Sequence, residues 1–273
     1  MMAATPHEVL SVSLTVDYPA KLGVLKNASF YINQAEVLGL VGTSGSGKST
    51  LALSILRLLN FKGGKASGAV RFAGNDLMQL SEREMRAIRG KEIGLVLQSP
   101  ISSLNPALRI GWQMREAWNA HAQSSRDWKR QTLAAFESVS LPTDDNFLRR
   151  YPSEISVGQG QRVLTAMAIL HHPQILIADE PTSALDVITQ SEILQLFSRL
   201  NRQLGMAILY ISHDLLSIAS ICHRLAILHQ GEIVECGEVE RIFTAPQHPY
   251  TKQLIAALPS QPLRAEAMTS SRS

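Results

Sequence analysis

Short apolar runs alternate with segments of helical period along most of the chain. Strands are predicted at Glu36–Val41 and Ile93–Leu97. Two further runs, Ile175–Ala178 and Met206–Ile211, are continuously apolar, as are central parallel strands that are covered on both faces. In Lys48–Leu59 the apolar residues recur at the spacing of an amphipathic helix. This alternation indicates an α/β fold.

Antiparallel pairing is predicted at two other places. A turn-rich stretch from Lys62 to Gly68 precedes a strand-like segment, Ala69–Phe72. Two more strand-like segments, Leu225–Leu228 and Glu232–Glu235, flank a Gln-Gly turn and predict a hairpin.

The middle of the chain, about 105–151, differs from the rest in its hydrophobic pattern and composition. It is helix-rich and contains all three tryptophans, and Pro142 and Pro152 interrupt it near its end. We interpret it as an inserted helical subdomain. The tail after Leu258 is rich in Ser, Pro and Ala, and we expect it to be loose.

Composition excludes several classes of protein. The chain has 273 residues, of which 45% are hydrophobic and 18% charged, which is ordinary for a globular protein. Its 26 basic and 23 acidic residues give a net charge of +3, too balanced to indicate a nucleic-acid surface. Two cysteines, Cys222 and Cys236, lie too far apart for a metal-thiolate pair, which favours a reduced, intracellular protein.

No segment resembles a targeting signal or a membrane span. The first residues, Met1 to Val9, lack a basic start followed by an apolar run. No stretch approaches the roughly 20 apolar residues that a spanning helix needs. We therefore expect any membrane role to depend on a partner protein.

A glycine-rich loop lies between the first predicted strand and the first predicted helix. Gly42-Thr-Ser-Gly-Ser-Gly-Lys-Ser-Thr50 matches the P-loop pattern in the strand–loop–helix context that the pattern requires, whereas a flexible linker would not need that context. Glycines let backbone N–H groups surround phosphates, and the helix N-terminus favours negative charge. We expect Lys48 to neutralise the β- and γ-phosphates of a bound nucleotide and Ser49 to bind Mg²⁺. The predicted phosphate-binding residues are Gly42, Ser44, Gly45, Ser46, Gly47, Lys48, Ser49 and Thr50.

Two adjacent carboxylates follow a predicted buried strand. Asp179 suits the hydration shell of Mg²⁺, and Glu180 suits a base that orients the attacking water. Taken alone, such a pair could simply be the solvated end of a strand. Together with the P-loop it indicates nucleotide hydrolysis.

A third motif indicates which family of nucleotide-hydrolysing proteins the chain resembles. Ile155-Ser-Val-Gly-Gln159 opens a helix that we expect to run to about His172, where Pro173 ends it. Alone, this could be a serine N-cap on an ordinary core helix. It closely resembles the Leu-Ser-Gly-Gly-Gln signature of ABC ATPases, however, and it precedes Asp179-Glu180 as it does in that family.

Further landmarks follow in the family's order, and the resemblance extends from about Val9 to Leu258. Gln98 resembles the Q-loop glutamine, Ser183–Asp186 the D-loop and His213 the switch histidine. Tyr18 is the best aromatic residue for stacking on adenine, with a buried hairpin tyrosine as the alternative. The resemblance implies Glu180, His213 and Gln98 as catalytic residues. It implies Ser49, Gln98 and Asp179 as Mg²⁺ ligands, and it implies further nucleotide contacts from Tyr18, Gln98, Ser156, Gly158, Gln159, Asp179 and Asp186.

The resemblance also implies a fold. It is a P-loop NTPase core with a mostly parallel sheet, an N-terminal antiparallel β subdomain and an α-helical subdomain inserted at about 105–165. The ABC ATPase domain would occupy 1–240 and a C-terminal extension 241–273. Two such domains meet head to tail around two ATPs, with Ser156 and Gly158 reaching a nucleotide held by the other domain. Val157 stands where the usual signature has glycine. Either the site is merely adjusted to this residue, or the chain supplies a weakened signature motif to an asymmetric heterodimer.

Two segments resemble the oligopeptide, dipeptide and nickel importer branch. These are the extended Q-loop, Gln98–Pro106, and the His-Pro-Tyr region, Pro246–Pro259, which otherwise reads as a turn before a short helix. The resemblance implies a second ATPase subunit (a heterodimer, or else a homodimer), two membrane permeases and an extracytoplasmic solute-binding protein. It implies no nucleic acid, and a peripheral position on the cytoplasmic face of the membrane. The solute stays open among peptides, nickel or another chelated metal, and opine-like compounds.

Two other classes of protein are alternatives to a transporter subunit, and each would show different sequence features. A non-transport ABC ATPase acting on DNA or ribosomes would show basic stripes, and a lone P-loop kinase or GTPase would not need Ser156–Gln159. The chain lacks the C-terminal cysteine cluster of many relatives, so no iron–sulfur centre is expected. Trp112, Trp118 and Trp128 could line a groove for a permease helix, but we expect core packing for at least two of them.

Overall fold

The computed structural model describes residues 8–59, 63–122, 124–183 and 185–258. The predicted loose tail after Leu258 lies outside the described residues. So do Lys62, the first residue of the predicted turn-rich stretch, and Ala184, which belongs to the predicted D-loop.

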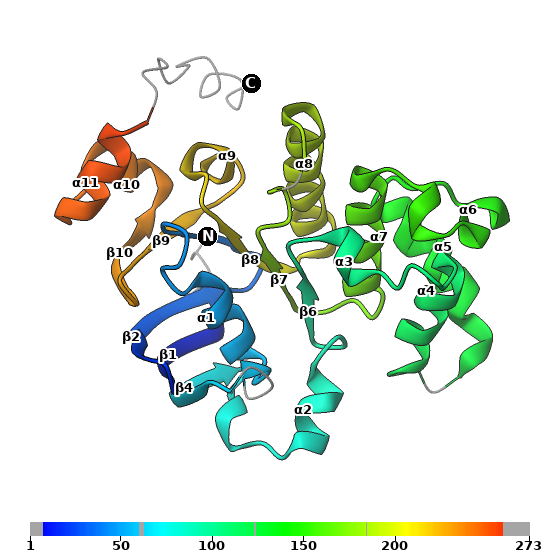
Figure 1. Cartoon of the computed structure of the whole chain (residues 1–273), viewed down its shortest axis with the longest axis horizontal. Coiled ribbons are helices and arrows are strands. Elements are labelled where there is room, and N and C mark those ends of the chain that lie inside the picture. Colours follow the sequence, from blue (N-terminus) through cyan, green and yellow to red (C-terminus); the bar gives the residue numbers. More distant parts are fainter. Residues whose placement is uncertain (1–7, 60–62, 123, 184, 259–273) are drawn as a thin grey trace, which may run out of the picture.

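A six-stranded sheet forms the centre of the molecule (Figure 1), in the order β10-β9-β3-β8-β7-β6. Strands β9, β3, β8, β7 and β6 pair in parallel, and β10 pairs antiparallel to β9 as the predicted hairpin. The sheet confirms the predicted strands with small shifts in their ends. The bounds are β3 (Val37–Val41), β6 (Ile93–Val96), β7 (Ile175–Asp179), β8 (Ala207–Ser212), β9 (Arg224–His229) and β10 (Glu232–Glu238).

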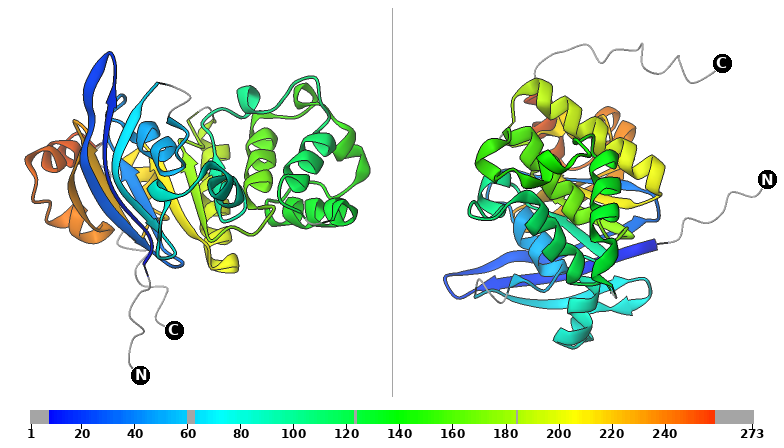
Figure 2. Two further views of the ribbon diagram at one scale, coloured as in Figure 1. Left: turned by 90° about the horizontal axis from the view of Figure 1, so that it is seen from below. Right: turned by 90° about the vertical axis from the view of Figure 1, so that its right-hand side faces the viewer.

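A second, antiparallel sheet lies against one face of the first, in the order β2-β1-β4-β5. Figure 2 shows its blue and cyan strands on one side of the molecule and the green helices extending to the other. Every second residue of β1 from Leu10 to Val16 is buried, so the alternating pattern of the sequence could have identified this strand. The bounds are β1 (Glu8–Tyr18), β2 (Lys21–Asn33), β4 (Lys65–Phe72) and β5 (Asn75–Asp76).

Neighbouring residues of the parallel strands enter two different cores. On β7, Leu176 and Ala178 pack with the helices, whereas Ile175 and Ile177 pack with the antiparallel sheet and α1 (Lys48–Ile55). Both faces of the strands are therefore covered, which explains why the strand sequences are continuously apolar.

Helix α1 ends four residues before the predicted Leu59. Its last turn closes as a Schellman motif, in which the Arg57 N–H donates to the Ser54 carbonyl and the Leu58 N–H to the Leu53 carbonyl. Arg57 takes the left-handed conformation, with a φ of 52°. Glycine normally marks that position, so this helix end carries no local signal in the sequence.

Four helices form the arm on the right of Figure 1, where the helical insert was expected. They are α4 (Ile110–Asn119), α5 (Trp128–Ser138), α6 (Asp145–Arg149) and α7 (Val157–Ile169). Helix α7 ends at Ile169, three residues before the predicted end at about His172. The expectation that at least two tryptophans pack in the core is wrong, because only Trp118 packs against a core cluster of the described residues. Trp112 is 56% exposed, and Trp128 is half-buried.

The remaining helices connect or flank these layers. They are α2 (Glu82–Ile88), α3 (Pro100–Ser103), α8 (Val187–Leu204), α9 (Leu215–Ala219), α10 (Val239–Thr244) and α11 (Pro249–Ala256), with 3₁₀ turns at Leu77–Gln79, Ser125–Asp127 and Pro152–Glu154. Within the described ranges, no helix combines the length and the apolar character needed to cross a membrane.

Candidate functional site

The glycine-rich loop joins β3 to α1, and its backbone conformations require glycine. Gly45 and Gly47 have φ values of 78° and 109°, and a Cβ on Gly42 would lie 2.3 Å from the Leu228 carbonyl oxygen. Gly47 is the N-cap of α1 and supplies no side chain to the first N–H groups of the helix. These N–H groups are oriented to bind an anion at the loop.

The side chain of Lys48 is buried inside the glycine-rich loop and donates hydrogen bonds to the loop backbone. Its side chain is only 4% exposed, and its Nζ donates to the carbonyl oxygens of Gly42 at 2.8 Å and Thr43 at 3.1 Å. Around it, Ser44, Gly45 and Ser49 are exposed and Thr50 is half-buried, whereas Ser46 is buried and its Oγ has no hydrogen-bond partner among the described residues. An anion in the loop would thus meet a fixed positive charge and backbone donors.

The Glu180 carboxylate contacts three side chains to which the sequence assigned a function, those of Lys48, His213 and Gln98. Its Oε1 lies 3.4 Å from Lys48 Nζ, while its Oε2 lies 3.2 Å from His213 Nδ1 and accepts a hydrogen bond from Gln98 Nε2 at 3.4 Å. Its backbone is left-handed, with a φ of 47°, where β7 turns away from the sheet. Asp179, one residue earlier, is buried at the strand end. The three predicted catalytic residues, Glu180, His213 and Gln98, are therefore brought together, next to the P-loop lysine.

The predicted signature residues form a second site at the start of α7. Ser156 and Gln159 make a reciprocal capping box: Ser156 Oγ accepts from the Gln159 N–H at 3.2 Å, and Gln159 Oε1 accepts from the Ser156 N–H at 3.1 Å. A pocket of about 380 Å³ opens beside them, and Asp186 and Thr189 also line it.

Val157 fits this geometry without strain. It is the first residue of α7 and does not take the left-handed conformation in which glycine is favoured. A β-branched residue is therefore compatible with the backbone conformation at this position. The adjusted site and the weakened signature both stay predictions.

Asp186 caps α8 beside the signature pocket. Its Oδ1 accepts from the N–H groups of Ile188 at 3.1 Å and Thr189 at 3.0 Å, and its Oδ2 from the Thr189 hydroxyl at 2.7 Å. The hydrogen bonds from the backbone and side chain of Thr189 hold the pKa of Asp186 below its ordinary value.

Long-range contacts that the sequence did not reveal join α7 to α8. Arg162 forms an ion pair of 2.9 Å with Glu192, and a Cβ on Gly158 would lie 2.8 Å from Thr189 Cγ2. Residues about 30 positions apart carry no local signal of such contacts.

Neither Lys48 nor Glu180 lines the pocket beside Ser156 and Gln159. Among the described residues, no hydrogen bond or ion pair joins Ser156 or Gln159 to Lys48 or Glu180. Tyr18 lies at the end of β1, half-buried, close to the position that a Cβ on Gly64 would occupy. Its role in stacking on adenine stays a prediction.

The His-Pro-Tyr segment has a clear structural role. His248 is the N-cap of α11 and Pro249 its first residue, as the interpretation as a turn before a helix predicts. The Tyr250 ring stacks on His229 of β9 with centroids 3.7 Å apart, and Glu235 of β10 accepts from the His248 N–H at 3.0 Å. The segment therefore anchors α11 to the hairpin.

Two family models match the chain. The model described as "ABC transporter" matches residues 25–183, which hold the P-loop, the signature helix and the Asp-Glu pair. The chain belongs to the ABC transporter family. A second model, "Oligopeptide/dipeptide transporter, C-terminal region", matches residues 234–270 and includes the His-Pro-Tyr segment.

Three curated relatives cover most of the chain. The oligopeptide transport ATP-binding protein OppD of Bacillus subtilis (strain 168) is 40% identical over 89% of this chain and 68% of the relative. The dipeptide transport ATP-binding protein DppD of Escherichia coli (strain K12) is 39% identical over 89% of this chain and 75% of the relative. The glutathione import ATP-binding protein GsiA of Escherichia coli (strain K12) is 41% identical over 88% of this chain, which spans only 40% of that relative.

Solved structures confirm the fold of this ABC ATPase. The cbiO1 protein of Clostridium perfringens, part of an ABC transporter complex, superposes with a TM-score of 0.76 at 24% identity over 93% of this chain and 96% of the other. A dimeric ATP-binding cassette with bound ADP and Pi superposes with a TM-score of 0.70 at 27% identity over 84% of this chain and 98% of the other. The chain is thus an ATP-binding and ATP-hydrolysing member of the family.

Proposed function

We propose that this chain is the ATP-hydrolysing subunit of an importer for peptides or a related solute such as nickel or a metal chelate. The observation that carries the proposal is the cluster in which Glu180 contacts Lys48, His213 and Gln98, in a chain whose C-terminal region matches the oligopeptide/dipeptide branch. The names of the relatives support a peptide as solute. The subunit would lie on the cytoplasmic face of the membrane, held there by permeases.

In the proposed mechanism, each polar group of the cluster has one task. Lys48 and the N–H groups of the glycine loop bind the β- and γ-phosphates. Glu180 orients the attacking water and accepts its proton. His213 and Gln98 hold the Glu180 carboxylate through Oε2, so that it is in place before the reaction.

A magnesium ion fits the donors beside this cluster. The Ser49 hydroxyl is exposed on the first turn of α1, the Asp179 carboxylate ends β7, and the Gln98 amide lies beside Glu180. These groups offer oxygen atoms, which Mg²⁺ prefers. When bound, Mg²⁺ would neutralise charge on the phosphates.

A complete site would need two chains. The P-loop of the same chain does not line the pocket at Ser156, Gly158 and Gln159, and in this proposal these residues contact a nucleotide held by a partner. That partner would be a second ATPase subunit in a heterodimer, or else a second copy of this chain. In this proposal the signature motif is adjusted to Val157 in place of the usual glycine and is not weakened by it. The other residues proposed to contact the nucleotide are Tyr18, Gly42, Ser44, Gly45, Ser46, Gly47, Thr50 and Asp186.

A groove beside the Q-loop suits a permease helix. It has a volume of about 320 Å³ and lies between the catalytic core and the helical arm, with Leu56, Leu97, Ala117, Leu164 and Met167 among its apolar walls. We assign residues 1–240 to the ATPase domain, about 105–165 to its helical subdomain and 241–273 to the C-terminal extension. A solute-binding protein outside the membrane would act through the permeases.

The test is purification of tagged Glu180→Gln from its native host in mild detergent with Mg-ATP, followed by mass spectrometry. Two multi-spanning permeases and a second ATPase are the expected companions. Glu137→Gln, which changes an exposed glutamate on α5, is the matched control for the tag and the detergent. Ribosomal or DNA-repair proteins without any membrane protein would overturn the transport role and leave the ATPase chemistry in place.

A further inference from the structure

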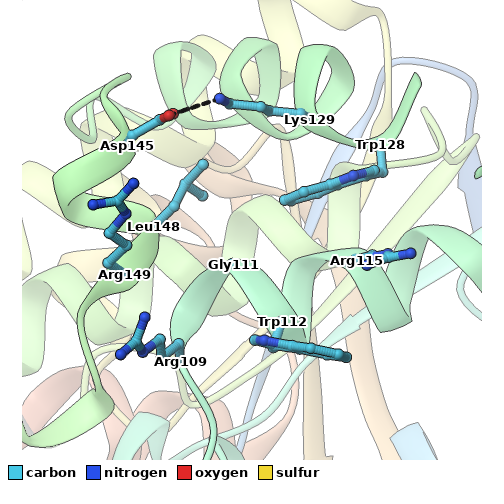
Figure 3. Close-up of a pocket in the computed structure, with 9 residues that line it drawn as sticks. All are labelled: Arg109, Gly111, Trp112, Arg115, Trp128, Lys129, Asp145, Leu148 and Arg149. Atoms are coloured by element: carbon cyan, nitrogen blue, oxygen red, sulfur yellow. Dashed lines mark hydrogen bonds and ion pairs between the residues drawn. The ribbon is translucent and has the colours of Figure 1, made fainter. Parts of the chain in front are cut away.

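A pocket outside the nucleotide site opens between α4, α5 and α6 on the helical arm (Figure 3). Its volume is about 290 Å³. Its floor is tight, because a Cβ on Gly111 of α4 would lie 3.0 Å from the Leu148 carbonyl oxygen of α6. None of the residues assigned to nucleotide binding lines it.

Two indole rings form opposite walls of this pocket. Figure 3 shows Trp128 of α5 on one side of the opening and Trp112 of α4 on the other. Trp112 is 56% exposed, and Trp128 is half-buried. An exposed indole beside a cavity has apolar surface that a partner can remove from water.

Positive charge lies at both ends of the pocket. Arg109 and Arg149 lie at one end and Arg115 at the other, and none of these three guanidinium groups forms an ion pair within the described residues. Lys129 differs, because it pairs with Asp145, with 2.6 Å between Nζ and Oδ1. The pocket therefore carries an excess of three positive charges around an apolar centre.

The pocket lies on a different face of α4 from the proposed permease groove. Ala117 lines that groove, whereas Trp112 and Arg115 line the pocket. At about 100° per residue, these two side chains lie roughly 140° and 200° around the helix from Ala117. One element seated in the groove would not also fill the pocket.

We propose that this pocket docks an acidic segment of a protein partner. In that segment, one aromatic side chain enters between Trp112 and Trp128, and carboxylates on either side of it meet Arg109 with Arg149 and Arg115. Tryptophan and arginine dominate the energetics of protein interfaces, and guanidinium–carboxylate pairs add strength and geometric selectivity. The volume admits one large side chain and is at the lower edge of the ~300–1,000 Å³ of small-molecule sites. This proposal does not depend on the transport role.

The test uses acetyl-Glu-Asp-Phe-Asp-Glu-amide as the probe, titrated calorimetrically into the full chain. We expect a saturable heat with a Kd below ~1 mM. Two control peptides, one with Lys at the acidic positions and one with Ala for Phe, should bind at least ~10-fold more weakly. No saturable binding of the acidic peptide would overturn the proposal.

Variants assign the binding to the pocket. Arg115→Glu and Trp112→Ala should each weaken the acidic peptide by ~10-fold or more. Arg202→Glu, at an exposed arginine in the last turn of α8, makes the same charge change elsewhere and should leave the affinity unchanged. Arg115→Glu should keep the basal ATPase rate, which shows that the variant is folded even if Trp112→Ala is not. Equal affinity for Arg115→Glu and the unaltered chain would overturn the proposal.

Binding of a small aromatic anion tests whether the pocket is a site for a small molecule and not for a segment of a partner protein. Phenylacetate should neither bind with the affinity of the peptide nor displace it at equal concentration. If it binds as tightly and depends on Arg115 in the same way, the pocket is a small-ligand site and the docking proposal is wrong.

Discussion

Glu180 and Lys48 form an ion pair with 3.4 Å between Oε1 and Nζ, although they are 132 positions apart in the sequence. The other carboxylate oxygen of Glu180 faces His213 and Gln98, so both oxygens are engaged by groups from different elements. The left-handed backbone at Glu180, where β7 ends, turns this side chain toward the loop that carries Lys48. The acid and the phosphate-binding lysine are therefore positioned by the sheet itself.

Replacing Glu180 with Gln should separate ATP binding from ATP hydrolysis. The amide keeps the shape of the side chain but cannot accept the proton of the attacking water. General-base assistance is typically worth ~10²–10⁴ in rate, so we expect turnover at least ~10²-fold slower with ATP affinity within a few-fold of the unaltered chain. Phosphate release and nucleotide titration measure the two quantities. Glu137→Gln controls for an exposed glutamate on α5, and turnover of the Glu180 variant within tenfold of the unaltered chain contradicts the assignment.

Asp186 should make thermal stability depend on pH through its cap on α8. Because the hydrogen bonds of Thr189 lower the pKa of Asp186 in the folded state, the carboxylate contributes stability above the unfolded pKa of about 4. That contribution is lost as the pH falls through the lower folded pKa. Asp186→Ala should therefore lower Tm at pH 7, and the Tm difference from the unaltered chain should shrink toward pH 3.

The matched control for this cap is Asp186→Asn, which keeps an oxygen acceptor for the N–H groups of Ile188 and Thr189. Its Tm at pH 7 should lie above that of the alanine variant. Scanning calorimetry from pH 3 to pH 7 checks both expectations, and a Tm difference for Asp186→Ala that is constant with pH would show that the charge plays no part.

The C-terminal helix should detach when its anchor on β10 is removed. Glu235 accepts from the backbone N–H groups of Gln247 at 2.8 Å and His248 at 3.0 Å, directly before α11. Glu235→Ala leaves both donors without this acceptor, so hydrogen exchange across Pro249–Ala256 should become faster. Glu235→Gln keeps one acceptor oxygen and should give an intermediate effect. Unchanged exchange in the alanine variant would mean that the stacking of Tyr250 on His229 holds the helix alone.

The chemistry of the site was easier to predict from the sequence than its packing. Lys48 and Glu180 follow strand ends that apolar runs mark, and parallel strands bring such ends to one edge of a sheet. The end of α1 was missed because Arg57 occupies a left-handed position that usually carries glycine. The expectation that at least two tryptophans pack in the core also failed, because large apolar side chains are usually buried and only the packing of the helical arm decides which of them stay outside.

The close approach of α7 and α8 gives the sharpest test of how the signature is positioned. A Cβ on Gly158 would lie 2.8 Å from Thr189 Cγ2, so Gly158→Ala should push the signature helix away from α8. We expect ATPase activity to fall by ~10-fold or more, since a small misplacement of a transition-state donor can cost that much.

A second substitution separates this steric effect from a direct loss of phosphate contact. Thr189→Ser removes Cγ2 but keeps the hydroxyl that donates to Asp186. The Gly158→Ala, Thr189→Ser double variant should therefore recover a large part of the activity, while Thr189→Ser alone should stay within about threefold of the unaltered chain. Steady-state phosphate release at saturating ATP compares the four proteins. A double variant no more active than Gly158→Ala would mean that the glycine is required by the nucleotide rather than by α8.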